Sequence, residues 1–283
     1  MAKHIVCLSF DYDVTSWHMP DEDTELASVV EIEDGHVGAK NILKVLEKQE
    51  IPATWFISGF TIQMFPEICD AVILAGHEVG HSGWTHVAPA KLSRKKEEDL
   101  LIRANATIQK LSGQKALGYR SPAWDHSPHT LDLLLKYDFL YESSMMGTDY
   151  DPYRVRRGYV EDGIKMQKEG HDTRLIEIPI KWSQDDHTKV ALPLLEPEPG
   201  QQPGVIDAWL DEFLYMQATS KWGIITYTCH PYVIGRGKRA DILSRFVAQL
   251  KTRGATFMTM ENAAREYNAR APFAARSDLS KAS

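Results

Sequence analysis

The sequence predicts an α/β fold, a single (β/α) barrel, because short apolar runs alternate with amphipathic helical patterns along the chain. Several of the runs are too continuously apolar to have a face in water, which is typical of parallel strands buried on both sides. About seven or eight strands are expected, and no GxGxxG motif opens the first helical segment. These observations favour a barrel over a doubly wound dinucleotide-binding sheet.

Strands are expected where β-branched and aromatic residues gather between turn-forming residues. In order, these runs are His4–Phe10, Ala53–Ser58, Glu78–Gly83, Ala116–Pro122, Phe139–Ser144, Ile176–Ile180, Gly223–His230 and Ala255–Met260. Apolar residues at a spacing of three or four predict three of the helices, and these residues are Leu101, Ala104, Ile108 and Leu111; Ile206, Leu210, Phe213 and Met216; and Ile242, Phe246, Val247 and Leu250. In such barrels the chemistry lies at the carboxyl ends of the strands, so polar residues directly after the runs are the candidates for a site.

The size of the chain allows one large hydrophobic core. With 283 residues, of which 43% are hydrophobic, it needs no second domain. We therefore predict a single catalytic domain over residues 1–267. Residues 268–283 are rich in Ala, Arg and Ser and are predicted to form a poorly ordered tail.

The overall charge and the N-terminus exclude several classes of partner. A formal net charge of -7 argues against nucleic-acid binding, which needs clustered Lys and Arg. The N-terminus has neither a basic leader with a cleavage site nor a membrane-spanning run, which predicts a cytoplasmic protein with no membrane partner. The cysteines Cys7, Cys69 and Cys229 form no CxxC pair, so neither a disulfide framework nor a thiolate zinc site is indicated.

Two carboxylates follow the first strand at a spacing of two. In the extended segment SFDYD, the side chains of Asp11 and Asp13 should share one face of the strand end. Their mutual repulsion requires a nearby cation, and unequal surroundings can then make one a metal ligand and the other a general base. A solvated turn is the alternative interpretation.

Three histidines lie in the segment GHEVGHSGWTH, residues 76–86, which follows an apolar helical stretch and includes the third predicted strand. Imidazoles in a glycine-bounded loop often bind metal, although a single histidine more often caps or fills a core. We interpret His77 as structural and treat His81 and His86 as candidate ligands.

Two further strand ends carry polar groups that suit acid–base chemistry. Arg120 precedes Pro122 and Trp124, and its guanidinium can bind a carboxylate such as Asp11 through two hydrogen bonds. His230 ends a long apolar strand, where a near-neutral pKa would let it donate a proton to a leaving nitrogen.

The motifs SFDYD, GHEVGHSGWTH, RSPAW and TYTCHP occur in an order that resembles the polysaccharide deacetylase family (NodB homology, carbohydrate esterase 4) over roughly residues 3–265. The further segments IPATWFISG, EIPIKWSQDD and PGQQPG resemble its intracellular branch, which includes peptidoglycan-deacetylase-like and cyclic-imide-hydrolase proteins and is related to metal-independent allantoinases. The resemblance implies a distorted (β/α)7 TIM-like barrel and a homotetramer or homodimer.

The resemblance also implies roles for single residues. Asp11 would be the general base, Arg120 the residue that orients it and His230 the general acid. Asp13 and His86 would be metal ligands, with zinc the expected divalent ion.

One position departs from the family pattern. Ser82 stands where the family's His-x-x-x-His motif has its first histidine, and a catalytic zinc normally keeps three protein ligands. His81 is the obvious substitute, but an offset of one residue in an extended segment turns its side chain away. The sequence leaves open whether metal is bound; without it, Asp11 would activate water, with Ser82 or His81 orienting it.

The expected substrate is a small amide. The long polar segments Met145–Asp172 and Gln184–Gly204 suggest lids or subunit contacts, and Trp124, Ser82 and Trp17 are candidate substrate-binding residues. Cyclic imides or other ring amides are ranked ahead of N-acetyl sugars.

Two other kinds of protein remain possible on the sequence. One is a catalytically silent ligand-binding barrel that has lost its metal through Ser82. The other is a hydrolase with a nucleophilic Ser82 or Cys229, although Ser82 lacks a GxSxG context and Cys229 should face away from His230. The acidic stretch of residues 19–34 has no assigned role.

Overall fold

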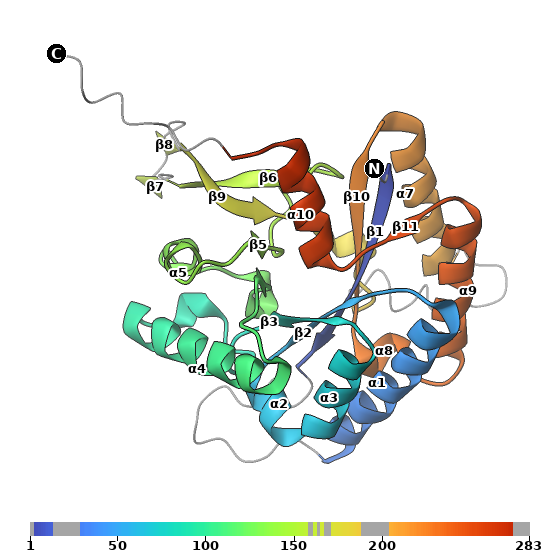
Figure 1. Cartoon of the computed structure of the whole chain (residues 1–283), viewed down its shortest axis with the longest axis horizontal. Coiled ribbons are helices and arrows are strands. Elements are labelled where there is room, and N and C mark those ends of the chain that lie inside the picture. Colours follow the sequence, from blue (N-terminus) through green and yellow to red (C-terminus); the bar gives the residue numbers. More distant parts are fainter. Residues whose placement is uncertain are drawn as a thin grey trace.

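A computed structural model describes residues 3–13, 29–157, 161–162, 165–166, 171–187 and 204–273. Its centre is a curled sheet with helices along the outer side, which gives a half-barrel (Figure 1). Trp17, most of the acidic stretch 19–34 and large parts of the two long polar segments lie outside the described residues. None of the described helices is long and apolar enough to cross a membrane.

The sheet runs in the order β10-β1-β2-β3-β4-β5-β9-β6, with β11 beside β1. From β10 to β9 all neighbours are parallel, as the buried apolar runs predict. The strands are β1 (His4–Tyr12), β2 (Thr54–Ile57), β3 (Glu78–His81), β4 (Gly118–Tyr119), β5 (Tyr141–Glu142), β6 (Tyr153–Arg157), β7 (Glu161–Asp162), β8 (Lys165–Met166), β9 (His171–Glu177), β10 (Gly223–Cys229) and β11 (Thr256–Phe257).

Three strands lie in the segment that the sequence predicts to be a loop. β6 pairs antiparallel with β9 at the sheet edge, and β7 and β8 form a small hairpin. The sequence of β6 lacks an apolar alternation, and only Val155 in it is buried. Backbone pairing with β9 therefore holds this strand, and no side-chain pattern marks it.

The helices are α1 (Val29–Gln49), α2 (Gly59–Met64), α3 (Pro66–Leu74), α4 (Arg94–Ser112), α5 (Thr130–Lys136), α7 (Val205–Thr219), α8 (Pro231–Ile234), α9 (Lys238–Thr252) and α10 (Met260–Arg270). Short 3₁₀ helices are η1 (Pro89–Lys91), η2 (Pro122–Trp124) and η3 (Trp182–Gln184). The three helices predicted from apolar spacing are α4, α7 and α9. Helix α10 continues to Arg270, beyond residue 267.

Alternation along β1 separates two hydrophobic clusters. Val6 and Leu8 face the outer cluster, which packs the sheet against the surrounding helices, while Ile5 and Cys7 face the inner cluster. Met260 of α10 also belongs to the inner cluster, so this helix fills the amino-terminal end of the half-barrel. Towards the carboxyl end of the strands the inner face becomes polar.

The segment after β9 returns to the far edge of the sheet. Asp185 forms a parallel β-bridge with Thr228 of β10, and the amide of Asp186 donates to the Thr228 carbonyl at 3.1 Å. This contact brings the chain that follows β9 beside the end of β10.

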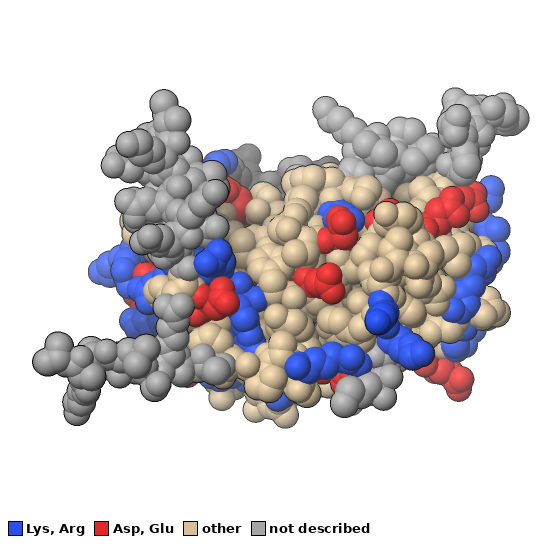
Figure 2. Space-filling view, turned by 90° about the horizontal axis from the view of Figure 1, so that it is seen from above, with Lys and Arg blue, Asp and Glu red and all other residues tan. Residues whose placement is uncertain are grey.

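On the face seen from above, the coloured Lys and Arg side chains lie in small groups among acidic ones (Figure 2).

Replacing Leu8 by Ala should lower the free energy of unfolding by about 2–5 kcal/mol, because the side chain is fully buried in the outer cluster and its loss leaves a cavity. Leu74→Ala is the matched control, since Leu74 is 87% exposed and its replacement should be nearly neutral. Urea denaturation followed by circular dichroism measures both. Equal effects of the two substitutions would contradict the assignment of the Leu8 side chain to the buried outer cluster.

Candidate active site

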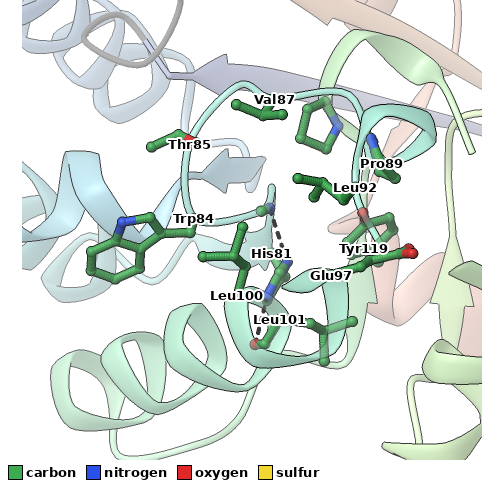
Figure 3. Close-up of a pocket in the computed structure, with 12 residues that line it drawn as sticks. His81, Trp84, Thr85, Val87, Pro89, Leu92, Glu97, Leu100, Leu101 and Tyr119 are labelled. Carbon is green, nitrogen blue, oxygen red and sulfur yellow. Dashed lines mark hydrogen bonds between the residues drawn. The ribbon is translucent and has the colours of Figure 1, made fainter. Parts of the chain in front are cut away.

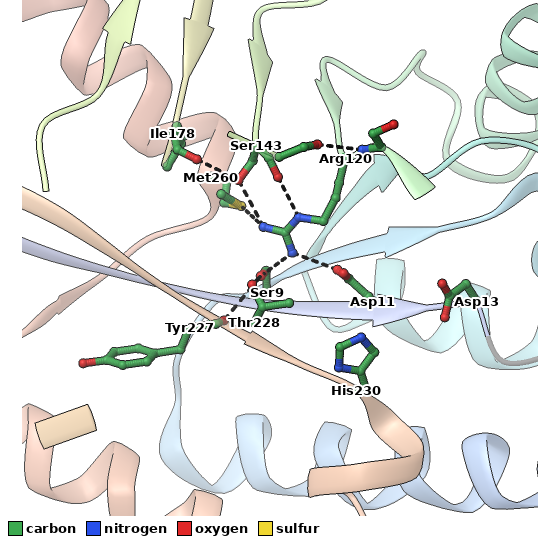
Figure 4. Close-up of polar contacts among 12 residues, drawn as sticks. Ser9, Asp11, Asp13, Arg120, Ser143, Ile178, Tyr227, Thr228, His230 and Met260 are labelled. Atoms are coloured by element: carbon green, nitrogen blue, oxygen red, sulfur yellow. Dashed lines mark hydrogen bonds and ion pairs between the residues drawn. The ribbon is translucent and has the colours of Figure 1, made fainter. Parts of the chain in front are cut away.

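Side chains from three strand ends meet on the polar inner face. Asp11 lies at the end of β1, Arg120 directly after β4 and His230 directly after β10, and all three are buried (Figure 4). Asp13 extends the same face of β1 by one step. The alternation of β1 puts both acids on the inner side, in line with the spacing of two in the sequence.

Arg120 is the most heavily bonded side chain of the site and is 1% exposed. Its Nη1 donates to Asp11 Oδ1 at 2.8 Å and to Ser9 Oγ at 2.7 Å. Its Nε donates to the Ser143 carbonyl at 2.9 Å, and Nη2 donates to Ser143 Oγ at 3.0 Å. The guanidinium also lies 4.3 Å from the centre of the Phe56 ring. The cation thus holds the Asp11 carboxylate in one position.

His230 is held by an acid that sequence analysis did not select. Its Nδ1 lies 2.8 Å from Asp186 Oδ1, and its backbone N–H donates to both carboxylate oxygens at 3.0 Å. The ring of His187 lies 5.2 Å from the His230 ring, between centroids. With Nδ1 bound to Asp186, Nε2 is the nitrogen left for chemistry.

The charges around His230 favour its protonated form. Burial alone would lower the pKa of the imidazole, but the hydrogen bond and charge of Asp186, with the charges of Asp185 and Asp11, outweigh it and raise the pKa to about 10. The surroundings of His230 therefore favour the imidazolium over the neutral ring. Asp11 is thus close enough to His230 for its charge to contribute to this shift in pKa.

Asp185, Asp186 and His230 offer ligand atoms within 4.8 Å of one another, close enough to share a metal ion. Both oxygens of Asp186, however, already accept hydrogen bonds from His230. This arrangement favours a histidine–aspartate pair over a metal centre. Asp185 is buried, which raises the pKa of its carboxyl to about 6 although the His230 charge opposes the shift. The adjacent acids in EIPIKWSQDD are the signal that could have identified both residues from sequence.

Asp13 and His86 contact each other directly. Asp13 Oδ2 lies 2.5 Å from His86 Nδ1, and the two side chains are 4% and 14% exposed. His187 is close enough for the charges of Asp13 and His86 to affect its pKa. Burial lowers the pKa of His187 most, and the charges of His230 and His86 lower it further, while the charge of Asp13 raises it.

His81 does not join this site, and the expectation that it replaces the missing ligand is wrong. Its Nε2 bonds the Leu101 carbonyl at 3.1 Å, and its Nδ1 accepts the Gly83 amide at 3.0 Å (Figure 3). The ring packs against Tyr119 and Phe139 on the outer side of the sheet, where burial lowers its pKa to about 4. Successive residues of a strand point to opposite faces of the sheet, so the His81 side chain faces the outer helices.

Ser82, one residue further on, is 4% exposed and follows the inner-facing positions of β3. Cys229 lies in the outer cluster, and burial raises the pKa of its thiol well above the ordinary value. The nucleophilic interpretation of Cys229 is therefore wrong. Trp124, a candidate substrate-binding residue, stacks on Trp182 at the strand ends.

The site of this curled (β/α) half-barrel thus combines a carboxylate bound by arginine with a histidine bound by a second carboxylate, two kinds of group that serve in general acid–base catalysis. A family model described as polysaccharide deacetylase matches residues 3–141. Over 252 residues the chain is 31% identical to a peptidoglycan deacetylase of Helicobacter pylori, covering 84% of this chain and 86% of that protein.

Two solved structures show the same fold. One assigned as a polysaccharide deacetylase from Mycobacterium smegmatis superposes with a TM-score of 0.77 at 25% identity, covering 98% of this chain and 96% of that one. The structure of an allantoinase has a TM-score of 0.75 at 18% identity, covering 96% and 93%, a likeness of fold alone. The chain belongs to the polysaccharide deacetylase family and is a hydrolytic enzyme acting on amide bonds.

Asp186→Asn should lower the pKa of His230 from about 10 by more than about one unit, because the charged hydrogen-bond partner is lost. Nuclear magnetic resonance of the ¹⁵N-labelled imidazole measures the titration. Asp185→Asn is the control, since it removes a charge without a direct bond to the ring and should shift the pKa less. A larger shift in Asp185→Asn would contradict the assignment.

The same pair links stability to pH. Because the folded-state pKa of His230 is raised above 6.5, its contribution to the free energy of unfolding is complete below about pH 6.5 and is lost as pH rises through about 10. In Asp186→Asn this alkaline loss should shrink.

Proposed function

We propose that the protein removes the acetyl group from an N-acetylated amino sugar of a short saccharide or peptidoglycan-type glycan. The observation that carries the proposal is that the Asp11 carboxylate, bound by Arg120, and His230, bound by Asp186, lie together at the carboxyl ends of β1 and β10. Similarity over most of its length to a peptidoglycan deacetylase supports the substrate class.

Asp11 is the proposed general base. Arg120 holds its Oδ1, which leaves the second carboxylate oxygen to take a proton from water. The oxygen of that water then bonds to the acetamide carbonyl carbon, and a tetrahedral intermediate forms. Because Arg120 fixes the carboxylate, little side-chain ordering is needed at the moment of attack.

His230 is the proposed general acid. Its Nε2 gives a proton to the amine nitrogen while the C–N bond breaks, and acetate and a free amino sugar are released. The bond from Nδ1 to Asp186 keeps the ring oriented and stabilises its charge before transfer.

A divalent ion fits the site incompletely. Asp13 and His86 would hold it, and zinc is the ion we propose, while the third position carries the hydroxyl of Ser82. When bound, such an ion polarises the carbonyl and lowers the pKa of water. With two strong ligands in place of three, we expect weak and exchangeable binding.

Ring amides are the second candidate substrates, and the sequence alone ranks them first. The similarity to a peptidoglycan deacetylase now favours N-acetyl sugars, because the allantoinase likeness concerns the fold alone. Turnover of N-acetylglucosamine oligomers compared with succinimide, hydantoin and allantoin separates the two. Hydrolysis of the ring amides alone would overturn the sugar proposal.

Asp11→Asn and His230→Ala should each reduce kcat by about 10²–10⁴-fold, because each removes one proton-transfer group. Circular dichroism checks that the fold is retained, and Asp132→Asn, at an exposed ion pair with Arg157, is the control. If the wild-type protein binds these compounds without turnover, and Asp11→Asn binds them equally well, the chain is a silent binding protein.

Ser82→His should tighten zinc binding by at least about tenfold, because it restores a third strong ligand beside Asp13 and His86. Titration calorimetry and elemental analysis of purified protein measure this, with Ser82→Ala as the control. A metal-free wild-type enzyme that remains active in chelator would show that the ion has no part in the reaction.

A further inference from the structure

Two fully buried glutamates stand opposite each other at the ends of β5 and β9. Glu142 and Glu177 are register partners in this parallel pair of strands, and both are 0% exposed. Because neighbouring strands lie about 5 Å apart, the side chains of register partners are within reach of each other on one face of the sheet. Two carboxyl groups therefore meet in the interior, and the proposed reaction uses neither of them.

A hydrogen bond joins the two carboxyl groups. In addition, Glu142 Oε1 lies 3.2 Å from His126 Nε2, and Glu177 Oε1 accepts the Met145 amide at 2.9 Å. An ionised carboxylate has no hydrogen to donate, so a bond between two carboxyl groups requires that one of them carries a proton. Two ionised carboxylates in contact and away from solvent would also repel each other strongly.

The surroundings of the two acids differ in a way that assigns the proton. Burial alone would raise the pKa of Glu142, but the charge of His126 and the hydrogen bond from Glu177 outweigh it and lower the pKa. For Glu177, burial and the adjacent Glu142 raise the pKa well above its ordinary value. The Met145 amide and the charge of Arg120 offset only part of that rise. Glu177 is therefore the protonated member of the pair.

Other ionisable groups near the pair reinforce this difference. Burial lowers the pKa of His126, but the charge and hydrogen bond of Glu142, with the charges of Asp125 and Glu97, outweigh it and raise the pKa. Burial raises the pKa of Tyr153 on β6, and the charges of the two glutamates raise it further. His126 thus supplies positive charge to Glu142, whereas Tyr153 stays a neutral phenol.

The segment held by this pair carries a partner of Arg120. Ser143 lies next to the first of the two acids, and its carbonyl and Oγ accept hydrogen bonds from Arg120 at 2.9 and 3.0 Å (Figure 4). Glu177 accepts the amide of Met145, two residues further along the chain. The paired carboxyl groups therefore hold both ends of residues 142–145.

We infer that Glu142 and Glu177 share one proton and thereby position the catalytic residues. The shared proton holds this segment in place, the segment holds Arg120, and Arg120 orients the Asp11 carboxylate. The catalytic part of the inference rests on the proposed function, in which Asp11 is the general base. Without the proton, two negative charges would lie side by side in the interior, and Glu177 would compete with Asp11 for the charge of Arg120.

Infrared spectroscopy detects the proton directly, because a protonated carboxyl group absorbs apart from an ionised one. At neutral pH we expect Glu177→Gln to lose one protonated-carboxyl band relative to the wild-type protein. The matched control is Glu47→Gln on the exposed side of α1, which should lose a band of an ionised carboxylate. Loss of only an ionised-carboxylate band in Glu177→Gln overturns the inference.

The pH dependence of stability gives a second readout. Because the folded-state pKa of Glu177 is raised above 4.5, its contribution to the free energy of unfolding is complete below about pH 4.5 and is lost as pH rises through the raised value. Glu177→Gln keeps a neutral hydrogen-bonding group and lacks this loss. Its urea midpoint relative to the wild-type protein should therefore increase between about pH 5 and pH 8. A difference that does not change with pH would count against a proton on Glu177.

Kinetics separate the positioning role from the proposed function. Glu177→Ala removes the bonds to Glu142 and Met145 and should lower kcat on N-acetylglucosamine oligomers about tenfold with KM little changed. Glu177→Gln should restore kcat to within about twofold, and Glu47→Ala is the control. If Glu177→Ala does not fold, Glu177→Leu fills the same space without the bonds and should show the same loss.

Wild-type kcat in the folded Ala or Leu variant overturns the positioning role even where the infrared band is present. If the wild-type protein turns over no sugar, the proposed function fails, and the infrared band still decides whether the two acids share a proton.

Discussion

The buried guanidinium of Arg120 connects most of the parts that make the site. It bonds to Ser9 and Asp11 of β1 and to Ser143 after β5, and its Nη2 lies 3.9 Å from Met260 Sδ of α10. A buried cation is stable only when its donors are satisfied, and leaving it unpaired would cost about 3–5 kcal/mol. The ends of β1, β4 and β5 are therefore connected by the same guanidinium that orients the Asp11 carboxylate.

The site contains a second buried ion pair, in which the roles of cation and anion are reversed. Around Arg120 a cation orients an anion, whereas around His230 the Asp186 carboxylate orients and charges an imidazole. Asp186 stabilises the charged form of the His230 ring, and Arg120 fixes the orientation of the Asp11 carboxylate, so the two buried groups have different charged partners. The polar inner face of the half-barrel thus holds two ion pairs, one centred on Arg120 and one on His230.

The end of β3 decides which of two neighbouring residues faces the inner side of the sheet. His81 and Ser82 are neighbours, so one faces the outer helices and the other the inner face. The imidazole is bonded at both nitrogens to backbone groups and contributes to packing alone. Ser82 is 4% exposed and, by strand alternation, faces the opposite side of the sheet from His81.

The apolar runs and helical patterns in the sequence predicted the parallel sheet, the main helices and the strand ends that carry Asp11, Arg120 and His230. These features could be predicted because they depend on local periodicity. Strand β6, the partnership of Asp186 with His230 and the stack of Trp124 on Trp182 were decided by the tertiary structure alone. Each of these needs segments distant in the chain to meet, and no pattern within one segment records which surface will lie opposite it.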